Sequence, residues 1–283
     1  MNNVLDITNY GIALFSPTIL QDFLKKEKIR SKKLLSKFEK DKDVYLKTLK
    51  EGIWMPIVKI DAGSYVIKLN GVDEPFDDTW IQKFSYEEFQ IEIKDTLCIG
   101  DIHLLEPFQT NQEMRYQDME GNILYKGHTY EAASGKYQLR VEGYVRKEAN
   151  GHASTYQNPE YGFLFTLNQV EVFKMAQDPR DDERYNFNIG YLTRSKQAKI
   201  EWENEIQAQK IGKEYYPLIE LDDGSICHLY VEFDSSHKYC RVSVLYKYIY
   251  DELLKSGSTF TISEETRTKG KTVLCPVGTL TIL

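Results

Sequence analysis

Side-chain types that bind zinc occur together near residue 230. They are Cys227, His228, His237 and Cys240. The ligands of a zinc ion must all lie about 2 Å from that one ion. If the surrounding residues pair as a hairpin across Asp234–His237, Cys240 lies opposite Val231, and Cys227 lies roughly 13 Å further along the strand. We therefore expect no metal site in this region.

A possible nucleophile and base occur together at Cys98 and His103, and His128 is followed three residues later by Glu131. Cysteine in an apolar run is usually an inert core residue, and residues three apart on a strand point to opposite faces. The chain also has no GxSxG, GxxxxGK[ST], GxGxxG or HExxH motif. We expect no catalytic residue. The alternative is an enzyme whose site is assembled from distant residues such as Cys98, His103 and His128.

Carboxylates gather beside an aromatic residue in one segment. The segment contains Asp73, Glu74, Asp77, Asp78 and Trp80. Such a surface suits the cationic groove of a nucleic-acid enzyme, because opposite charges speed the encounter of two proteins. We predict that these five residues bind a protein partner. Further acidic clusters lie at 181–183 and 222–223.

The overall charge restricts the class of partner. The 283 residues include 36 basic and 43 acidic ones, which gives a net charge of −7 and disfavours a general nucleic-acid or anionic-membrane binder. The first residues lack the basic and apolar regions of a secretory signal. The four cysteines are widely spaced and form no CxxC pair. We expect a cytoplasmic protein with reduced thiols, no cofactor and no membrane contact.

Helical periodicity predicts two charged helical regions. The first runs from Pro17 to about Lys50, and its residues 25–51 carry eleven Lys/Arg and five Asp/Glu. We interpret this stretch as a solvated face whose lysine stems cover apolar surface; the alternative is a basic helix that docks on an acidic surface. The second region begins at Ser195 and ends just before Gly212, with Ala198, Trp202 and Ile206 on one face.

Short β-type runs follow the first helical region. Residues 56–60 and 65–69 flank Asp61–Ser64, and this pattern predicts a hairpin. Ser85 and Glu88 form a capping box, which predicts a helix of about one turn, because residues 89–93 alternate as a strand does.

Stronger strand patterns lie in the middle and at the end of the chain. Apolar and polar residues alternate at 137–146, and 163–172 is the expected partner of that strand. A polar linker is expected at 178–183. In the last part of the chain we expect a short helix at 248–255 and strands at 218–221, 226–233, 239–246, 260–262 and 272–283.

Two pairs of segments resemble each other. Residues 54–65 align without gaps on 215–226 and share Pro, Asp, Gly and Ser, while 97–105 resembles 274–283. Turn chemistry alone can produce Asp-x-Gly-Ser between apolar runs. Because two matches occur in the same order, we predict a duplicated unit in which a helix packs over a small antiparallel sheet.

Together these patterns predict a β-rich α+β protein made of two related helix-plus-antiparallel-sheet units. The first domain, 1–180, holds repeat copy one at about 30–105, enlarged by a β-sandwich-like, β-rich addition at 106–190. The second domain, 191–283, is a helix-plus-sheet domain that holds copy two.

One segment carries a family resemblance. Gly135-Lys136-Tyr137-Gln138-Leu139-Arg140-Val141 resembles strands of bacterial nuclease-inhibitor and toxin-immunity proteins. The whole chain, which is acidic and has no active-site motif, is similar in character to that group. The resemblance implies a bacterial protein that binds a cognate toxin, and it transfers no functional residue to this sequence.

We therefore expect a cytoplasmic immunity-type protein that binds a toxin, for instance a nuclease, and blocks its active site. Two alternatives stay open. One is a structural or adaptor protein of a phage or secretion assembly, in which the duplication supplies two docking faces. The other is an enzyme whose site is not visible in the sequence.

Overall fold

The computed structural model describes residues 3–149, 154–174, 176–181, 184–204, 211–221, 224–234, 236–244, 253–268 and 271–283. The chain divides into two compact units, Met1–Gly190 and Tyr191–Leu283. Strands make up 48% and helices 15% of the residues that the structure describes, so the expected β-rich α+β class is confirmed. Acidic residues 182–183 and 222–223, and most of the helix expected at 248–255, fall outside the described residues.

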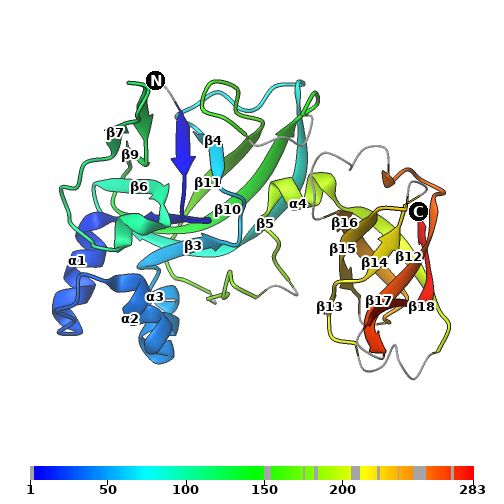
Figure 1. Ribbon diagram of the computed structural model, residues 1–283. Coiled ribbons are helices and arrows are strands. Elements are labelled where there is room, and N and C mark those ends of the chain that lie inside the picture. Colours follow the sequence, from blue (N-terminus) through cyan, green and yellow to red (C-terminus); the bar gives the residue numbers. More distant parts are fainter. Residues whose placement is uncertain are drawn as a thin grey trace. The chain divides into compact units, whose positions relative to one another are not determined.

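The first unit contains a five-stranded sheet (Figure 1). Its order is β1 (Val4–Ile7), β4 (Gly63–Leu69), β11 (Tyr161–Val170), β10 (Gly135–Arg146) and β5 (Trp80–Ile93). β11 runs parallel to β4, and the other neighbours are antiparallel. The alternation expected for β10 is confirmed, because Leu139, Val141 and Val145 are buried and Val141 lies opposite Phe165 of the expected partner strand.

A four-stranded sheet completes the framework of this unit. Its order is β3 (Trp54–Val58), β2 (Gly11–Phe15), β6 (Thr96–Asp101) and β9 (Gly127–Glu131). Every residue of β2 is buried, so both faces of the sheet are covered. A short helix, η1 (Ile102–Leu105), follows β6, and β7 (Arg115–Gln117) pairs with β8 (Ile123–Tyr125) as a separate hairpin.

Three short helices occupy the predicted helical region. They are α1 (Pro17–Lys26), α2 (Leu34–Lys40) and α3 (Lys42–Lys50), and Figure 1 shows them gathered at one side of the unit, near β3 and β6. Asp41 separates α2 from α3, because its carboxylate caps α3 by accepting a hydrogen bond from the Val44 N–H at 3.2 Å. Their apolar side chains pack with Phe15 and Trp54 of the four-stranded sheet in one core cluster.

The described residues of 173–188, here called the strap, follow β11 and pack along the first unit. The Phe173 ring lies where a Cβ on Gly52 would come within 2.6 Å of it. The Tyr45 hydroxyl of α3 donates a hydrogen bond to Asp178 at 2.7 Å, and the Arg180 guanidinium lies 3.4 Å from the centre of the Tyr45 ring. Residues expected in a polar linker therefore bind α3.

The second unit is a closed six-stranded antiparallel barrel. Its order is β15 (Ile226–Phe233), β14 (Leu218–Glu220), β17 (Thr259–Thr268), β18 (Lys271–Ile282), β12 (Lys196–Trp202) and β16 (Tyr239–Val244). Pairing of β16 with β15 closes it, β13 (Glu214–Tyr215) adds to β15, and α4 (Ile189–Arg194) precedes β12. Strands occur in each of the five segments expected in the last part of the chain.

The hairpin expected at 56–69 is wrong. β3 pairs with β2, whereas β4 pairs with β1 and β11, so the two strands belong to different sheets. The matching segment in the second unit does form a hairpin, with Leu218 opposite His228. Because the two similar segments hold different positions, the predicted duplication is also wrong. Their shared Asp-x-Gly-Ser reflects turn preferences alone.

Residues 106–190 are not a separate sandwich-like addition. They supply β10 and β11, which lie between β4 and β5 in the centre of the five-stranded sheet. The sheet therefore needs strands from both parts of the predicted first domain, and neither part builds it alone.

Two predicted helices are strands. β5 runs through Ser85 and Glu88, and β12 replaces the start of the helix expected from 195 onwards. Ala198 and Trp202 are four residues apart, and this spacing shares a face in a helix and in a strand alike. Ile200 lies between them and is buried in the same core, which fits only the strand.

Replacing Tyr45 by Phe should weaken the strap. The change removes the hydroxyl that Asp178 accepts and leaves a partly buried carboxylate with one donor fewer. We expect the free energy of unfolding to fall by about 1–3 kcal/mol, measured by urea denaturation at pH 7. The matched control is Tyr10→Phe, because the Tyr10 side chain is exposed; equal stability of the two variants would contradict the role of this hydrogen bond.

Candidate functional site

The four predicted partner-binding carboxylates lie in the connection between β4 and β5, and Trp80 is the first residue of β5. Phe76 holds this loop in place. The Phe76 ring covers Gly162 of β11 so closely that a Cβ there would overlap it. Ring centroids lie 4.5 Å apart for Phe76 and Tyr144 and 4.6 Å apart for Phe76 and Trp80. We call Phe76, Trp80 and Tyr144 the ring cluster.

Two cations flank the ring cluster. The Lys68 Nζ lies 4.6 Å from the centre of the Phe76 ring and donates hydrogen bonds to the Glu74 and Pro75 carbonyls at 2.8 and 3.1 Å. The Arg146 guanidinium lies 4.6 Å from the centre of the Trp80 ring. Cation–ring contacts of this kind stabilise exposed sites by about 0.5–1 kcal/mol each. The loop is thus tied to β4 and β10 as well as to β11.

The four carboxylates of the loop differ in what they contact. Asp73 accepts hydrogen bonds from the Asn3 side-chain amide at 2.6 Å and from the Leu69 N–H at 2.9 Å. Asp77 accepts hydrogen bonds from the hydroxyl and the N–H of Thr79, which lower the pKa of Asp77. These two residues shape the loop.

Glu74 and Asp78 are exposed, and neither carboxylate forms a hydrogen bond or an ion pair with another residue that the structure describes. Trp80 is half-buried in the ring cluster. Of the five predicted residues, Glu74 and Asp78 are therefore the carboxylates that a partner could engage without breaking the loop. Lys68, Tyr144 and Arg146 were missed, because they come from other strands and no local pattern connects them to the loop.

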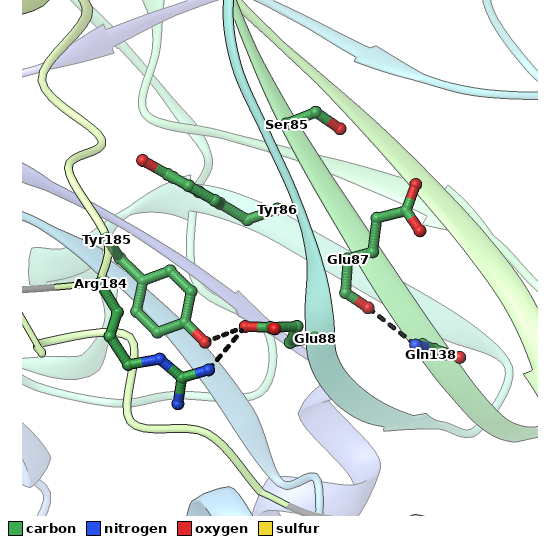
Figure 2. A pocket seen from close by; sticks show the side chains of 7 residues that line it. All are labelled: Ser85, Tyr86, Glu87, Glu88, Gln138, Arg184 and Tyr185. Carbon is green, nitrogen blue, oxygen red and sulfur yellow. Dashed lines mark hydrogen bonds and ion pairs between the residues drawn. The ribbon is translucent and has the colours of Figure 1, made fainter.

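A second feature is a hollow of about 620 Å³ at the outer edge of β5 (Figure 2). It is lined by Ser85, Tyr86, Glu87, Glu88, Gln138, Arg184 and Tyr185. Leu139 of β10 lies opposite Phe89 and Val141 lies opposite Tyr86, so two residues of β5 face one residue of β10. This extra residue is a β-bulge, a feature that often lies beside functional sites. Sequence analysis did not predict this bulge, because it interpreted Ser85 and Glu88 as a capping box.

Ion pairs hold the walls of the hollow. The Glu88 carboxylate accepts hydrogen bonds from the Tyr185 hydroxyl and from Arg184, the latter at 3.2 Å. Arg184 also donates to the Gln177 side chain at 2.6 Å. On the other side of β5, the Glu87 carboxylate accepts a hydrogen bond from Arg140 at 3.2 Å. The strap therefore supplies one wall, and β10 supplies the other.

The candidate catalytic residues do not meet in the structure. Cys98 is fully buried, and burial raises the pKa of its thiol to about 12, so it is not a thiolate at neutral pH. The His103 side chain is exposed on η1. His128 lies opposite Ile99 in the pairing of β9 with β6, whereas Cys98 lies opposite Thr129, so His128 and Cys98 are on opposite faces.

The zinc-type residues near 230 are also separated, although the expected register was wrong. Cys240 lies opposite Phe233, two residues from the expected position, and Cys227 pairs with Ile219 of β14. The His237 ring contacts the Ile211 carbonyl at 3.0 Å. Over the described ranges of the chain, no three His, Cys, Asp or Glu side chains are grouped so that they could hold a metal ion.

None of the known family models matches this chain, and no curated protein or solved structure is significantly similar to it. In the part of the chain that the structure describes, no helix combines the length and the apolar character needed to cross a bilayer. Function must therefore be inferred from the residues themselves.

Gly162→Ala should displace the loop that carries the carboxylates. The new Cβ would overlap the Phe76 ring and would lie 3.0 Å from the Val66 carbonyl oxygen. We expect a loss of about 1–3 kcal/mol in urea denaturation and a changed near-ultraviolet circular dichroism of the ring cluster. Gly212→Ala is the control, because nothing lies within 4 Å of its Cβ. A variant with the parent's stability and spectrum would show that Phe76 does not hold the loop.

His128 should make the protein less stable in mild acid. Burial lowers the pKa of His128 below its usual 6.5, and the nearby Val4 carbonyl and Asp73 only partly oppose this effect. The unfolded chain therefore binds the proton more strongly than the folded protein does. The stabilisation is present above about pH 6.5 and is lost as the pH falls below that value.

His128→Gln should remove this pH dependence. We expect the slope of unfolding free energy between pH 7 and pH 5 to become smaller, by at most about 1.4 kcal/mol per pH unit, which is the limit for one proton. Urea denaturation across this range measures it. His228→Gln is the control, because that side chain is exposed. Identical slopes for the parent and His128→Gln would show that His128 titrates as it does in the unfolded chain.

Proposed function

We propose that this chain is an immunity-type protein that binds a cognate toxin and blocks its active site, and that the loop from Asp73 to Trp80 provides the central contact. One observation carries the proposal: Glu74 and Asp78 are exposed and unpaired within the described residues, on a loop that Phe76 and Lys68 fasten to the sheet. Binding through side chains on a fixed loop costs little conformational entropy.

The chemistry of the loop indicates a cationic partner. Both exposed carboxylates are free to accept hydrogen bonds from lysine or arginine side chains. The half-buried Trp80 ring adds aromatic area, and tryptophan is enriched among residues that dominate binding energy. The net charge of −7 attracts a basic protein over long range and speeds its encounter with this surface.

A nuclease is the toxin class that fits best. Its active-site groove must bind phosphates, and it therefore carries arginine and lysine side chains. An acidic loop placed in that groove would occupy the phosphate positions and exclude the nucleic acid. A toxin that acts inside the cell would require its inhibitor in the cytoplasm, which is the location we propose for this chain.

The test is co-expression of this chain with the product of the neighbouring gene. We expect that product to stop growth when it is expressed alone, and this chain to restore growth and to bind it in isothermal titration calorimetry. The double variant Glu74→Lys/Asp78→Lys should raise the dissociation constant at least about ten-fold, because it places two positive charges against a cationic groove. Protection of the cells should fall with the affinity.

Glu39→Lys is the matched control. It makes the same kind of charge reversal at an exposed residue of α2, and we expect parent-like binding. A neighbouring product that is harmless or does not bind this chain would overturn the immunity function. Binding by the double variant as strong as that of Glu39→Lys would overturn the role of the loop.

A further inference from the structure

We propose that the helical region of the first unit binds the phosphodiester backbone of a nucleic-acid duplex. The contact is made by exposed lysine and arginine side chains that we call the basic surface: Lys28, Arg30, Lys32, Lys40, Lys42 and Lys50. This inference goes beyond the proposed function, because it concerns other residues and does not require a toxin.

The charge of this protein is distributed unevenly. Residues 25–51 hold eleven Lys/Arg and five Asp/Glu, a net charge of +6, although the whole chain carries −7. At physiological salt, exposed charges more than about 8 Å apart are largely screened from each other. The average charge disfavours a general nucleic-acid binder, but a polyanion bound at this region responds to the local positive charge.

The six cations of the basic surface are not engaged by the rest of the protein. Each side chain is exposed, and none forms an ion pair with another residue that the structure describes. Several carboxylates of the same region are engaged. Glu27 pairs with Lys47 at 2.7 Å, Glu51 pairs with Lys26 at 3.1 Å, and Asp41 caps α3. Much of the local negative charge is therefore neutralised in place, whereas the positive charge of the six cations stays available.

The connection between α1 and α2 holds its cations on an anchored backbone. The Ile29 N–H donates a hydrogen bond to the Leu24 carbonyl at 2.8 Å, and the Lys32 carbonyl accepts one from the Phe108 N–H at 2.8 Å. The Ile29 side chain also packs against the core cluster of the helices. Lysine is favoured in the last turn of a helix because it offsets the helix dipole, but Arg30 and Lys32 lie outside any helix.

The third helix extends the basic surface. Lys42 and Lys50 are eight residues apart on α3, so they share a side of the helix and lie about 12 Å apart along its axis. The ends of α1 and α3 lie side by side, because the ion pairs of Glu27 and Glu51 join them. Lys28 follows Glu27 and Lys50 precedes Glu51, so the cations of the connection and those of α3 belong to one area.

This area matches the charge density of a duplex. A duplex carries one negative charge per about 1.7 Å of its axis, so about seven phosphate charges fall within 12 Å. Glu39 and Asp43 are exposed on α2 and α3 and reduce the excess of unpaired positive charge from six to four. We therefore expect about four phosphate contacts.

The side chains around these cations favour a nucleic acid over a membrane or an acidic protein. Leu46 is the one large apolar side chain exposed among residues 25–51, all of which the structure describes. Membrane-bound helices bury an apolar face, and protein interfaces have an apolar or aromatic centre. Phosphates need only cations, because the release of counterions drives binding. No aromatic ring is exposed in this range to stack on unpaired bases, which favours a duplex over a single strand.

The experiment titrates the full chain into a fluorescein-labelled DNA duplex of about 20 base pairs and follows fluorescence anisotropy. We expect a micromolar dissociation constant at about 50 mM NaCl. The logarithm of the association constant should fall with the logarithm of the salt concentration with a slope of about −3 to −4, the value for four phosphate contacts. A duplex of unrelated sequence should bind equally well, and a single strand of the same length should bind more weakly.

A triple variant locates the binding. Lys28→Gln/Arg30→Gln/Lys32→Gln removes three charges from exposed positions. We expect it to raise the dissociation constant at least about ten-fold at the same salt concentration, and to make the salt slope shallower by about two or more, because each lost phosphate contact contributes about 0.9.

The matched control is Lys147→Gln/Lys196→Gln/Lys255→Gln. It changes the net charge by the same amount at exposed positions outside the basic surface, and we expect the dissociation constant to stay within about two-fold of the parent's. Absence of binding at about 50 mM NaCl, a salt slope near zero, or equal weakening by the two triple variants would each overturn the proposal.

Two competing polyanions test the class of partner. Vesicles of phosphatidylserine and phosphatidylcholine represent a membrane, and poly-glutamate represents an acidic protein. We expect neither to displace the labelled duplex at an equal concentration of negative charge. Preferential binding of the vesicles or of poly-glutamate would assign the surface to that class and overturn the proposal. These results do not depend on toxin binding, because Glu74 and Asp78 lie outside the basic surface.

Discussion

β5 imposes the constraint on which much of the first unit depends. It has 14 residues and pairs with β10 from Trp80 opposite Arg146 to Ile93 opposite Gly135, and among the described strands none pairs with its other side. A long edge strand is a template for pairing with other chains. Here the edge is interrupted by a bulge with two glutamates and covered by the strap. The Tyr86 hydroxyl accepts a hydrogen bond from the Asn186 N–H of the strap at 3.1 Å.

The acidic loop and the hollow both lie where this edge is irregular. The acidic loop ends at the first residue of β5, and the hollow lies at the bulge seven residues later. Trp80, the last residue of the acidic loop, and the hollow belong to one strand, and β10 pairs with that strand from end to end, so the sheet backbone fixes the spacing between them.

The sequence-based predictions were correct where apolar residues recur with one regular period along a whole element. The alternation of 137–146 located β10, and Pro17 marked the start of the helices. At β5 sequence analysis recognised only the alternation of 89–93. It failed before that point, because Ser85 and Glu88 have the spacing of a helix cap and the bulge interrupts the alternation there. It failed again at β12, where a four-residue spacing was compatible with both structures.

The candidate site could be found only in part for a similar reason. Composition alone drew attention to Asp73 through Trp80, since the carboxylates and the ring are neighbours in the chain. Tyr144 and Arg146 join them through β10, which is distant in sequence. Contacts that depend on tertiary pairing leave no local pattern from which to infer them.

The strap has a consequence for how the chain tolerates damage. Its Phe187 ring packs against Phe84, Tyr86 and Phe89, and so covers an aromatic row beside the outer edge of β5. A proteolytic nick that released this segment would bare that row together with the strand edge. An exposed strand edge next to exposed aromatic side chains favours pairing with strands of other molecules. A single cleavage in the strap would therefore promote aggregation of this unit.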